Sequence, residues 1–237
     1  MSYIQGYVTP VSTNAREAYL AHAQVAAAVF LELGASQVVD CWGDDVPHGE
    51  VTDFYRAVDA RPDETIVFGW MRWPSKGAAE QAMTTAMTDP RLSPETNPMP
   101  FDGRRMIFGG FAPLLELGAP IPGGYIDGFV AAVPTQGRDR FEAFARACDP
   151  IFMEFGAVWI MEGWGVDVPV GTQTDLHRAV QRKADESVLF SWVQWPDKAT
   201  RDAGSASMME DPRFAKMEMP FDGRRLIYGG FDPMLGL

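Results

Sequence analysis

The chain has 237 residues, of which 46% are hydrophobic and 22% charged, a composition typical of a folded globular protein rather than a disordered one. Its formal net charge of −12 argues against nucleic acid or an anionic membrane as the main partner, because a phosphate-rich surface demands a basic footprint. Its longest apolar stretch falls short of the roughly 18 residues of a membrane span, and its start lacks a signal-peptide pattern, so we expect a cytoplasmic protein.

The first half of the chain alternates between strand and helix patterns. Gly34 is a typical helix C-cap and Ser75 a typical N-cap, and Pro74 and Asp89-Pro90 flank the second helix. The predicted elements are a strand at about 3–9, a helix from Asn14 to about Leu33, strands at 35–42 and 64–73, a helix after Ser75, and a strand at 104–111. This βαββαβ order is that of the ferredoxin-like unit.

The second half repeats the first. "YIQGYV" at 3–8 matches "YIDGFV" at 125–130, and "MPFDGRRMIFGGF" at 99–111 matches "MPFDGRRLIYGGF" at 219–231. Matching residues of the two halves lie 122 positions apart up to the "DPR" segment and 120 positions apart after it. A tandem duplication explains this pattern. We predict a first repeat at 1–117, a Gly/Pro-rich linker at 118–124 and a second repeat at 125–237.

The strand at 64–73 is apolar on both faces. Ile66, Phe68 and Trp70 alternate with Val67, Met71 and Trp73, and the second copy does the same. The helices of a ferredoxin-like unit cover one face of its sheet, so the other face needs a second sheet. The predicted fold class is therefore α+β: two ferredoxin-like βαββαβ repeats whose antiparallel sheets pack face to face as an intrachain, pseudo-dimeric α/β barrel.

One position breaks the symmetry of the helices. Pro150 stands where the first copy has Ala28, in the middle of the predicted helix. Proline removes a helical hydrogen bond and clashes with the preceding turn, so we expect this helix to break or kink near Cys148.

Several motifs together resemble a known family. "GDDVPHG", "DETIVFGW", "DPR" and "MPFDGRRMIFGGF" are similar to those of the YbaA-like bacterial family, the domain of unknown function 1428. The resemblance implies a dimeric α/β barrel, here fused into one chain, and implies no activity. In the second copy Val166 replaces Asp44 and Val170 replaces His48, so we expect any active site to lie in the first copy.

The sequence predicts neither a metal site nor a disulfide bond. The three histidines do not occupy equivalent positions and lack metal-ligand spacing, so we predict no metal and no cofactor. Cys41 and Cys148 fall in different elements of different repeats, and we expect both to be reduced thiols.

The loop acids and a loop histidine are the first candidates for ligand binding. Asp45 and Asp167 follow a Trp-Gly pair in both copies, where a carboxylate could hydrogen-bond a ligand or instead cap its own turn. His48 lies three residues from Asp45, either oriented by that carboxylate or simply exposed on a loop.

Two tryptophans and two arginines complete the candidate set. Trp70 and Trp192 could wall a cavity between the sheets or be core residues. The Arg-Arg pairs are predicted to begin a strand, so Arg105 and Arg225 would point inward, toward an anionic ligand or a protein carboxylate, and their neighbours outward. The Gly-Gly pair that follows is expected to be a bulge or to receive an indole ring.

Two functional classes remain open from the sequence. One is a small-molecule binding protein or cofactor-independent enzyme whose cavity lies between the sheets and takes a small apolar or anionic ligand. The other is a non-catalytic structural or interaction protein. No catalytic residue is assigned, and the chain is expected to be a monomeric pseudo-dimer or a homodimer without nucleic-acid or membrane partners.

Overall fold

The computed structural model describes residues 2–236. Met1 and Leu237, the outer ends of the two predicted repeats, lie outside the described residues. The first repeat contributes β1 (Tyr3–Ser12), α1 (Arg16–Glu32), β2 (Gln37–Asp45), α2 (Phe54–Ala57), β3 (Glu64–Trp73), α3 (Lys76–Ala86) and β4 (Ile107–Gly118). The second contributes β5 (Tyr125–Pro134), α4 (Arg138–Glu154), β6 (Trp159–Asp167), α5 (Leu176–Ala179), β7 (Glu186–Trp195), α6 (Lys198–Glu210), α7 (Pro212–Ala215) and β8 (Ile227–Leu235).

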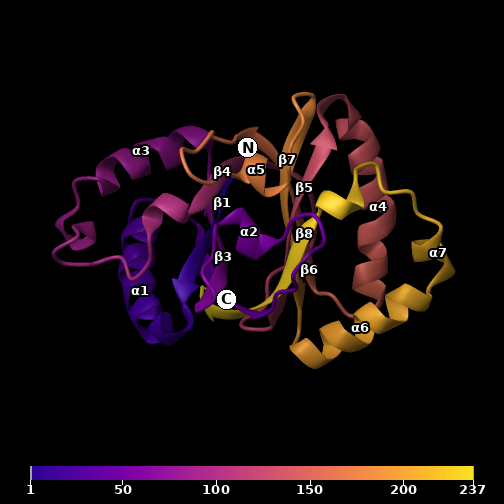
Figure 1. Ribbon diagram of the computed structural model, residues 1–237, viewed down its shortest axis with the longest axis horizontal. Coiled ribbons are helices and arrows are strands. Elements are labelled where there is room, and N and C mark those ends of the chain that lie inside the picture. Colours follow the sequence, from indigo (N-terminus) through magenta and orange to yellow (C-terminus); the bar gives the residue numbers. More distant parts are fainter. Residues whose placement is uncertain (1, 237) are drawn as a thin grey trace.

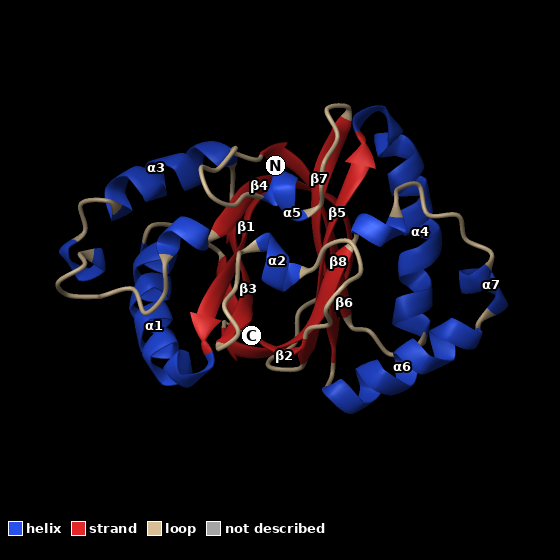
Figure 2. Ribbon diagram, in the orientation of Figure 1, coloured by secondary structure: helices blue, strands red, loops and turns tan. Residues whose placement is uncertain are grey.

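The strands form one closed antiparallel barrel in the order β1-β3-β2-β8-β5-β7-β6-β4. Each repeat supplies four neighbouring strands, and the two sheets join along β2–β8 and β4–β6. Figures 1 and 2 show the long helices outside the barrel, α1 and α3 on one side and α4 and α6 on the other. The predicted fold class is thereby confirmed.

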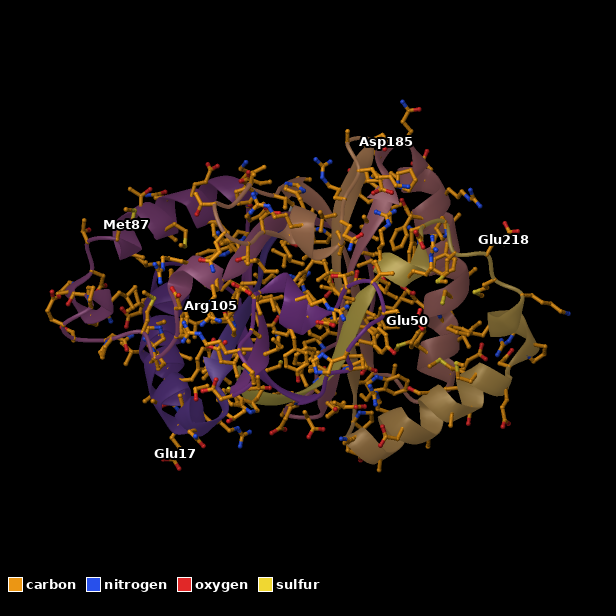
Figure 3. All side chains as sticks on the ribbon, in the orientation of Figure 1. Glu17, Glu50, Met87, Arg105, Asp185 and Glu218 are labelled. Atoms are coloured by element: carbon orange, nitrogen blue, oxygen red, sulfur yellow. The ribbon has the colours of Figure 1, made fainter. Side chains whose placement is uncertain are left out.

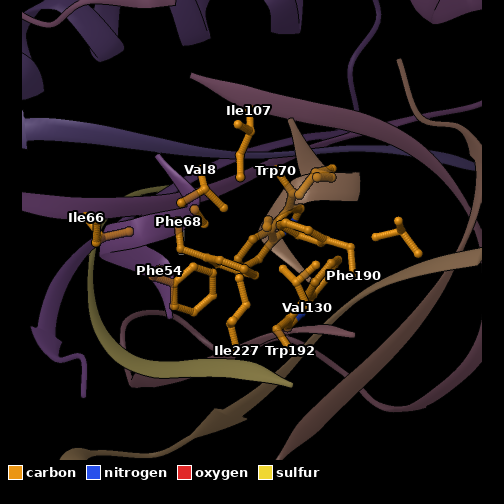
Figure 4. Packing of buried hydrophobic residues seen from close by; sticks show 14 of the residues in the cluster. Val8, Phe54, Ile66, Phe68, Trp70, Ile107, Val130, Phe190, Trp192 and Ile227 are labelled. Atoms are coloured by element: carbon orange, nitrogen blue, oxygen red, sulfur yellow. The ribbon is translucent and has the colours of Figure 1, made fainter. Parts of the chain in front are cut away.

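The barrel interior is packed with aromatic rings from both sheets. Phe68 and Phe190 stack with ring centroids 4.5 Å apart, and Trp70 and Trp192 stack at 4.1 Å. Trp159 packs against both indoles. Figure 4 shows this cluster. The alternation predicted for β3 is correct, since its second set of side chains packs outside the barrel, in clusters with residues of α1 and α3.

The short helices α2 and α5 lie across one end of the barrel in Figure 2 and contact each other. Phe54 of α2 and Leu176 of α5 are fully buried in the interior cluster. Asp53 and Asp175 begin these helices by accepting the backbone N–H of Arg56 and Arg178. This end of the barrel is therefore covered by protein.

The structure confirms the helix caps predicted at Gly34 and Ser75. Gly34 has φ of +104°, and the Ser75 hydroxyl accepts the Ala78 backbone N–H at 3.2 Å. The helix does not break near Cys148, since α4 continues through Pro150 to Glu154, so that alternative of the prediction is wrong. Within residues 2–236, none of the helices is long and apolar enough to cross a membrane.

The turn predicted at Asp102-Gly103 is present, but Arg104 and Arg105 belong to this 3₁₀ turn rather than to the predicted start of a strand, since β4 begins only at Ile107. The second glycine of each Gly-Gly pair packs against a phenol ring and not against the expected indole ring. A side chain on Gly110 would overlap the phenol of Tyr3, and one on Gly230 that of Tyr125, so tyrosines and not tryptophans pack there.

Candidate functional site

A largely apolar pocket lies outside the barrel, between the sheet of the second repeat and α4. We call it the outer pocket; it has a volume of about 170 Å³. Six phenylalanines line it, joined at the rim by Met219 from the segment between α7 and β8. For comparison, an apolar cavity of about 150 Å³ is known to hold a benzene molecule. The outer pocket is thus large enough for a small apolar ligand.

Helix α4 presents one face to this pocket because its inward residues recur at helical spacing. Phe141, Phe144, Cys148, Asp149 and Phe152 all line it. In Figure 1, α4 stands at the outer side of the second repeat, with the yellow segment leading to β8 passing over it. Phe221 of that segment lies 6.2 Å from the rings of both Phe141 and Phe144, which closes one wall.

The polar part of the pocket is a pair of carboxyl groups and a hydroxyl. Asp149 of α4, Glu162 of β6 and Ser191 of β7 all line it. Ser191 lies directly opposite Glu162 in the β6–β7 ladder, and its hydroxyl donates a short hydrogen bond to Glu162 Oε2. Asp149 is 5% exposed, and its Oδ2 atom finds no hydrogen-bond partner within residues 2–236.

Burial in apolar surroundings disfavours charge on both acids. It raises the pKa of Asp149 to about 9, with repulsion from Glu162 adding to the effect. Burial also raises the pKa of Glu162 to about 7, partly offset by the Ser191 hydrogen bond. Between these two pKa values, at pH near 8, the pair therefore holds one proton. Cys148 also lines the pocket, and burial raises the pKa of its thiol to about 12, so it stays neutral.

The first repeat fills the equivalent space. A row of Tyr7, Gly69 and Asp40 crosses β1, β3 and β2, where the second repeat has Phe129, Ser191 and Glu162. Tyr7 lies over Gly69 and donates to Asp40 Oδ1 at 3.1 Å, while Tyr19 donates to the same atom at 2.7 Å.

Ser191, in the middle of the second-repeat row, limits which side chain can lie over it. A Cβ atom at Gly69 would lie 2.7 Å from the Tyr7 hydroxyl oxygen and closer still to its ring. Ser191 therefore excludes a ring placed as that of Tyr7 is. Phe129 is only half-buried, whereas Tyr7 is buried, and Asp149 stands where the first repeat has Ala27. The outer pocket is thus built by substitutions in the second repeat.

The seven ligand-binding candidates from the sequence lie elsewhere. Trp70 and Trp192 come together, but as fully buried, stacked rings inside the barrel. Asp45 pairs with Arg201 of α6 at 2.7 Å, and Asp167 with Lys76 of α3 at 2.9 Å, so both tie one repeat to the other.

His48 is an exposed loop residue next to Asp53 rather than Asp45. Its Nδ1 atom lies 3.7 Å from Asp53 Oδ2, and its ring packs on Tyr55 with centroids 4.6 Å apart. It lines a small pocket of about 40 Å³. Across residues 2–236, the His, Cys, Asp and Glu side chains form no group suited to a metal ion.

Arg105 and Arg225 point inward as predicted, but each meets a protein carboxylate. Arg105 donates two hydrogen bonds of 2.6 Å to Glu64, and Arg225 donates to Glu186 at 2.8 and 2.6 Å. Figure 3 labels Arg105, which lies well inside the outline of the protein.

These arginines also hold two strained turns. Arg105 Nη1 donates to the carbonyl of Asp59, and Arg225 Nη1 to that of Gln181, at 2.9 Å in each case. Asp59 and Gln181 have φ of +51° and +47°, a region that non-glycine residues seldom adopt. Both arginines are thus occupied in holding the fold.

Sequence comparison places the chain in a family. The model of the family described as "Protein of unknown function (DUF1428)" matches residues 2–103 and again 124–223. The chain belongs to this family. The uncharacterised protein YbaA of Escherichia coli strain K12 is 47% identical over 113 residues, which are 97% of YbaA and 47% of this chain. This family member thus carries the family unit twice, and the predicted family resemblance is confirmed.

Solved structures show the same fold at low sequence identity. A putative monooxygenase from Lactobacillus acidophilus NCFM superposes with a TM-score of 0.57 at 11% identity, covering 98% of this chain and 94% of its own. An anthrone oxidase-like protein gives 0.57 at 12% identity, covering 99% and 92%. At such identities the likeness concerns the fold alone.

Sequence reasoning missed Asp149, Glu162 and Ser191, although the repeats carried a signal. Aligned copies show Asp149 at Ala27, Ser191 at Gly69, and phenylalanine in place of Tyr7 and Tyr19. Each substitution is ordinary alone. Together they replace the hydrogen-bonded cluster of the first repeat with acids in apolar surroundings. A residue-by-residue comparison of the repeats could have found these substitutions.

Proposed function

We propose that this protein binds a small, neutral and largely apolar molecule in the outer pocket of the second repeat. The observation that carries the proposal is the unpartnered Asp149 Oδ2, buried among phenylalanines beside Glu162. Buried polar atoms without partners are costly and rare, so this one is suited to a ligand's polar atom. The pocket's apolar walls suit the ligand's carbon skeleton.

The charge of the pocket favours a neutral ligand over the anionic one considered from the sequence. At pH near 8 the carboxyl pair carries one negative charge, and the described residues that line the pocket include no lysine or arginine. An anion would therefore meet repulsion without compensation. That other barrels of this fold bear the names putative monooxygenase and anthrone oxidase-like protein is in keeping with a small-molecule role.

A set of probes with one carbon skeleton tests the proposal. We expect indane and 2-indanone to bind to the protein in saturation-transfer NMR and to raise its melting temperature, with indane-2-carboxylate weaker by about tenfold or more at pH near 8. If neither neutral probe binds, the proposal is wrong and the non-catalytic interpretation is favoured.

The structure offers a matched pair of variants. Phe129→Tyr with Ser191→Gly installs the tyrosine and the glycine of the first-repeat row beside Glu162, so a tyrosine can lie over the glycine and donate to Glu162. We expect this double variant to fold and to lose probe binding. Tyr7→Phe alters the equivalent position of the first repeat and should bind the probes as the wild type does. Equal binding by the double variant would place the ligand elsewhere.

A further inference from the structure

The polar groups of the outer pocket are arranged as a proton donor beside a proton acceptor. Glu162 accepts the hydroxyl hydrogen of Ser191, which favours its ionised form. Asp149 lies on the facing helix among apolar side chains, and none of the described residues that line the pocket is basic, which favours its protonated form. Two carboxyl groups whose surroundings favour opposite protonation states form an acid–base pair.

The arrangement also restricts the chemistry of the ligand. The Ser191 hydroxyl already donates to Glu162, whereas Asp149 Oδ2 has no partner among the described residues, so the carboxylic acid of Asp149 can donate to a ligand. A donor calls for an acceptor such as a carbonyl oxygen. Glu162 lines the same pocket and can take a proton from a carbon atom next to that carbonyl.

We propose that Asp149 and Glu162 are catalytic residues that interconvert the keto and enol forms of an apolar carbonyl compound bound in the outer pocket. This inference rests on the proposed function and deepens it by naming the substrate class. The class is a neutral, mainly hydrocarbon ketone with a hydrogen on the carbon beside the carbonyl.

The step balances within the pair and the substrate. Glu162 takes the proton from the α-carbon, and the electrons of the broken C–H bond form the C=C bond of the enol. The π electrons of the C=O bond accept the Asp149 proton and form the enol O–H bond. Glu162 is then a carboxylic acid and Asp149 a carboxylate, so the charge of the pair is unchanged. The reverse step returns a proton to carbon, and no oxidant or reductant is required.

Exchange of hydrogen for deuterium at the α-carbons of 2-indanone tests this step. In D₂O the bound ketone gains solvent deuterium each time the enol forms and returns. We expect the wild-type protein to speed the exchange by roughly 100-fold or more over buffer, the size typical of general acid–base catalysis. The exchange is followed by the loss of the α-proton signal in NMR.

Two isosteric variants separate catalysis from binding. Glu162→Gln removes the base, and Asp149→Asn keeps a hydrogen-bond donor but cannot release its proton. We expect both to fold, to bind 2-indanone in saturation-transfer NMR, and to lose most of the exchange. The rate should rise as Glu162 ionises and fall as Asp149 loses its proton, which gives a bell-shaped pH profile that a structural role would not produce.

The outcomes that overturn the inference are distinct from those that overturn the proposed function. If 2-indanone binds the wild type without faster exchange, the inference fails while the binding function stands. If 2-aminoindane binds more tightly than 2-indanone, the pocket selects a cation through the carboxylate, and both the neutral ligand of the proposed function and the ketone assignment are wrong. If none of the neutral probes binds, both fail. Exchange that persists in Glu162→Gln would assign the base elsewhere.

Discussion

Ser191 lies directly across from Glu162 in the β6–β7 ladder and donates a hydrogen bond to its carboxylate. The same two positions of the first repeat hold Gly69 and Asp40, and there the hydroxyl comes from Tyr7, whose ring lies over the glycine. One exchange of glycine for serine thus supplies a donor and displaces a ring. This difference separates a filled space in one repeat from a pocket in the other.

The buried acids make stability depend on pH. The folded pKa values of Asp149 and Glu162 are raised to about 9 and about 7, whereas unfolded carboxyls titrate near 4. The folded state therefore binds more protons than the unfolded state between these limits, and stability falls as pH rises through them. We expect the urea midpoint to decrease between about pH 5 and about pH 9.

Asp149→Ala, which installs the residue of the first repeat, should flatten this decrease. We expect it to raise the free energy of unfolding by about 1–3 kcal/mol at alkaline pH, because it removes a buried polar group without a partner. Asp139→Ala, exposed on the same helix, is the control and should keep the wild-type slope. An identical slope in Asp149→Ala would mean that Asp149 is already ionised in the folded protein.

The buried hydroxyls of the first repeat should be needed for stability. Burial raises the pKa of Asp40, while its hydrogen bonds from Tyr19 and Tyr7 oppose that rise. Tyr7→Phe removes one of these bonds, and we expect a loss of about 1–3 kcal/mol in the free energy of unfolding. Tyr228→Phe, at a half-exposed phenol, should cost under about 0.5 kcal/mol. Equal effects would show that Asp40 does not depend on the Tyr7 hydroxyl.

The ion pair of Arg105 and Glu64 should matter for folding rather than for ligand binding. Their side chains are 4% and 8% exposed, so Arg105→Ala would leave a buried carboxylate without its partner. We expect destabilisation by about 3–5 kcal/mol in urea unfolding. Arg104→Ala, at the exposed neighbouring residue, should leave the free energy of unfolding nearly unchanged. A stable Arg105→Ala variant that lost probe binding would restore Arg105 as a ligand-binding residue.

The stacked indoles in the barrel interior should be energetically coupled. Trp70→Ala and Trp192→Ala each open a cavity in a fully buried cluster, at a cost of about 3–5 kcal/mol. A double-mutant cycle should give a coupling of about 0.5–1.5 kcal/mol from the ring contact. Trp42 packs outside the barrel near Tyr19, so its alanine variant should be additive with Trp192→Ala. If the losses in stability of Trp70→Ala and Trp192→Ala were additive, the two stacked rings would not be coupled and this prediction would be wrong.

The sequence by itself determined the repeat, the order of the strands and long helices, and the barrel, but not the short helices α2, α5 and α7. These follow from local and periodic properties: caps at Gly34 and Ser75, the two-residue alternation of β3, and an apolar second face that only another sheet could cover. The tertiary structure decided which side chains meet. Whether Arg105 faces a ligand or Glu64, and whether Trp70 lines a cavity or stacks on Trp192, depends on residues far apart in the chain.

The site shows the same division at finer scale. Glu162 reads as one acid within an apolar strand, and Asp149 as one acid before a proline in a helix. Their shared burial arises only when α4 packs on the sheet, because desolvation depends on all surrounding atoms rather than on neighbours in sequence. The sequence pattern therefore predicts the barrel, and comparison of the repeats marks the substituted positions, but only the packing of α4 on the sheet brings the two acids into one apolar pocket.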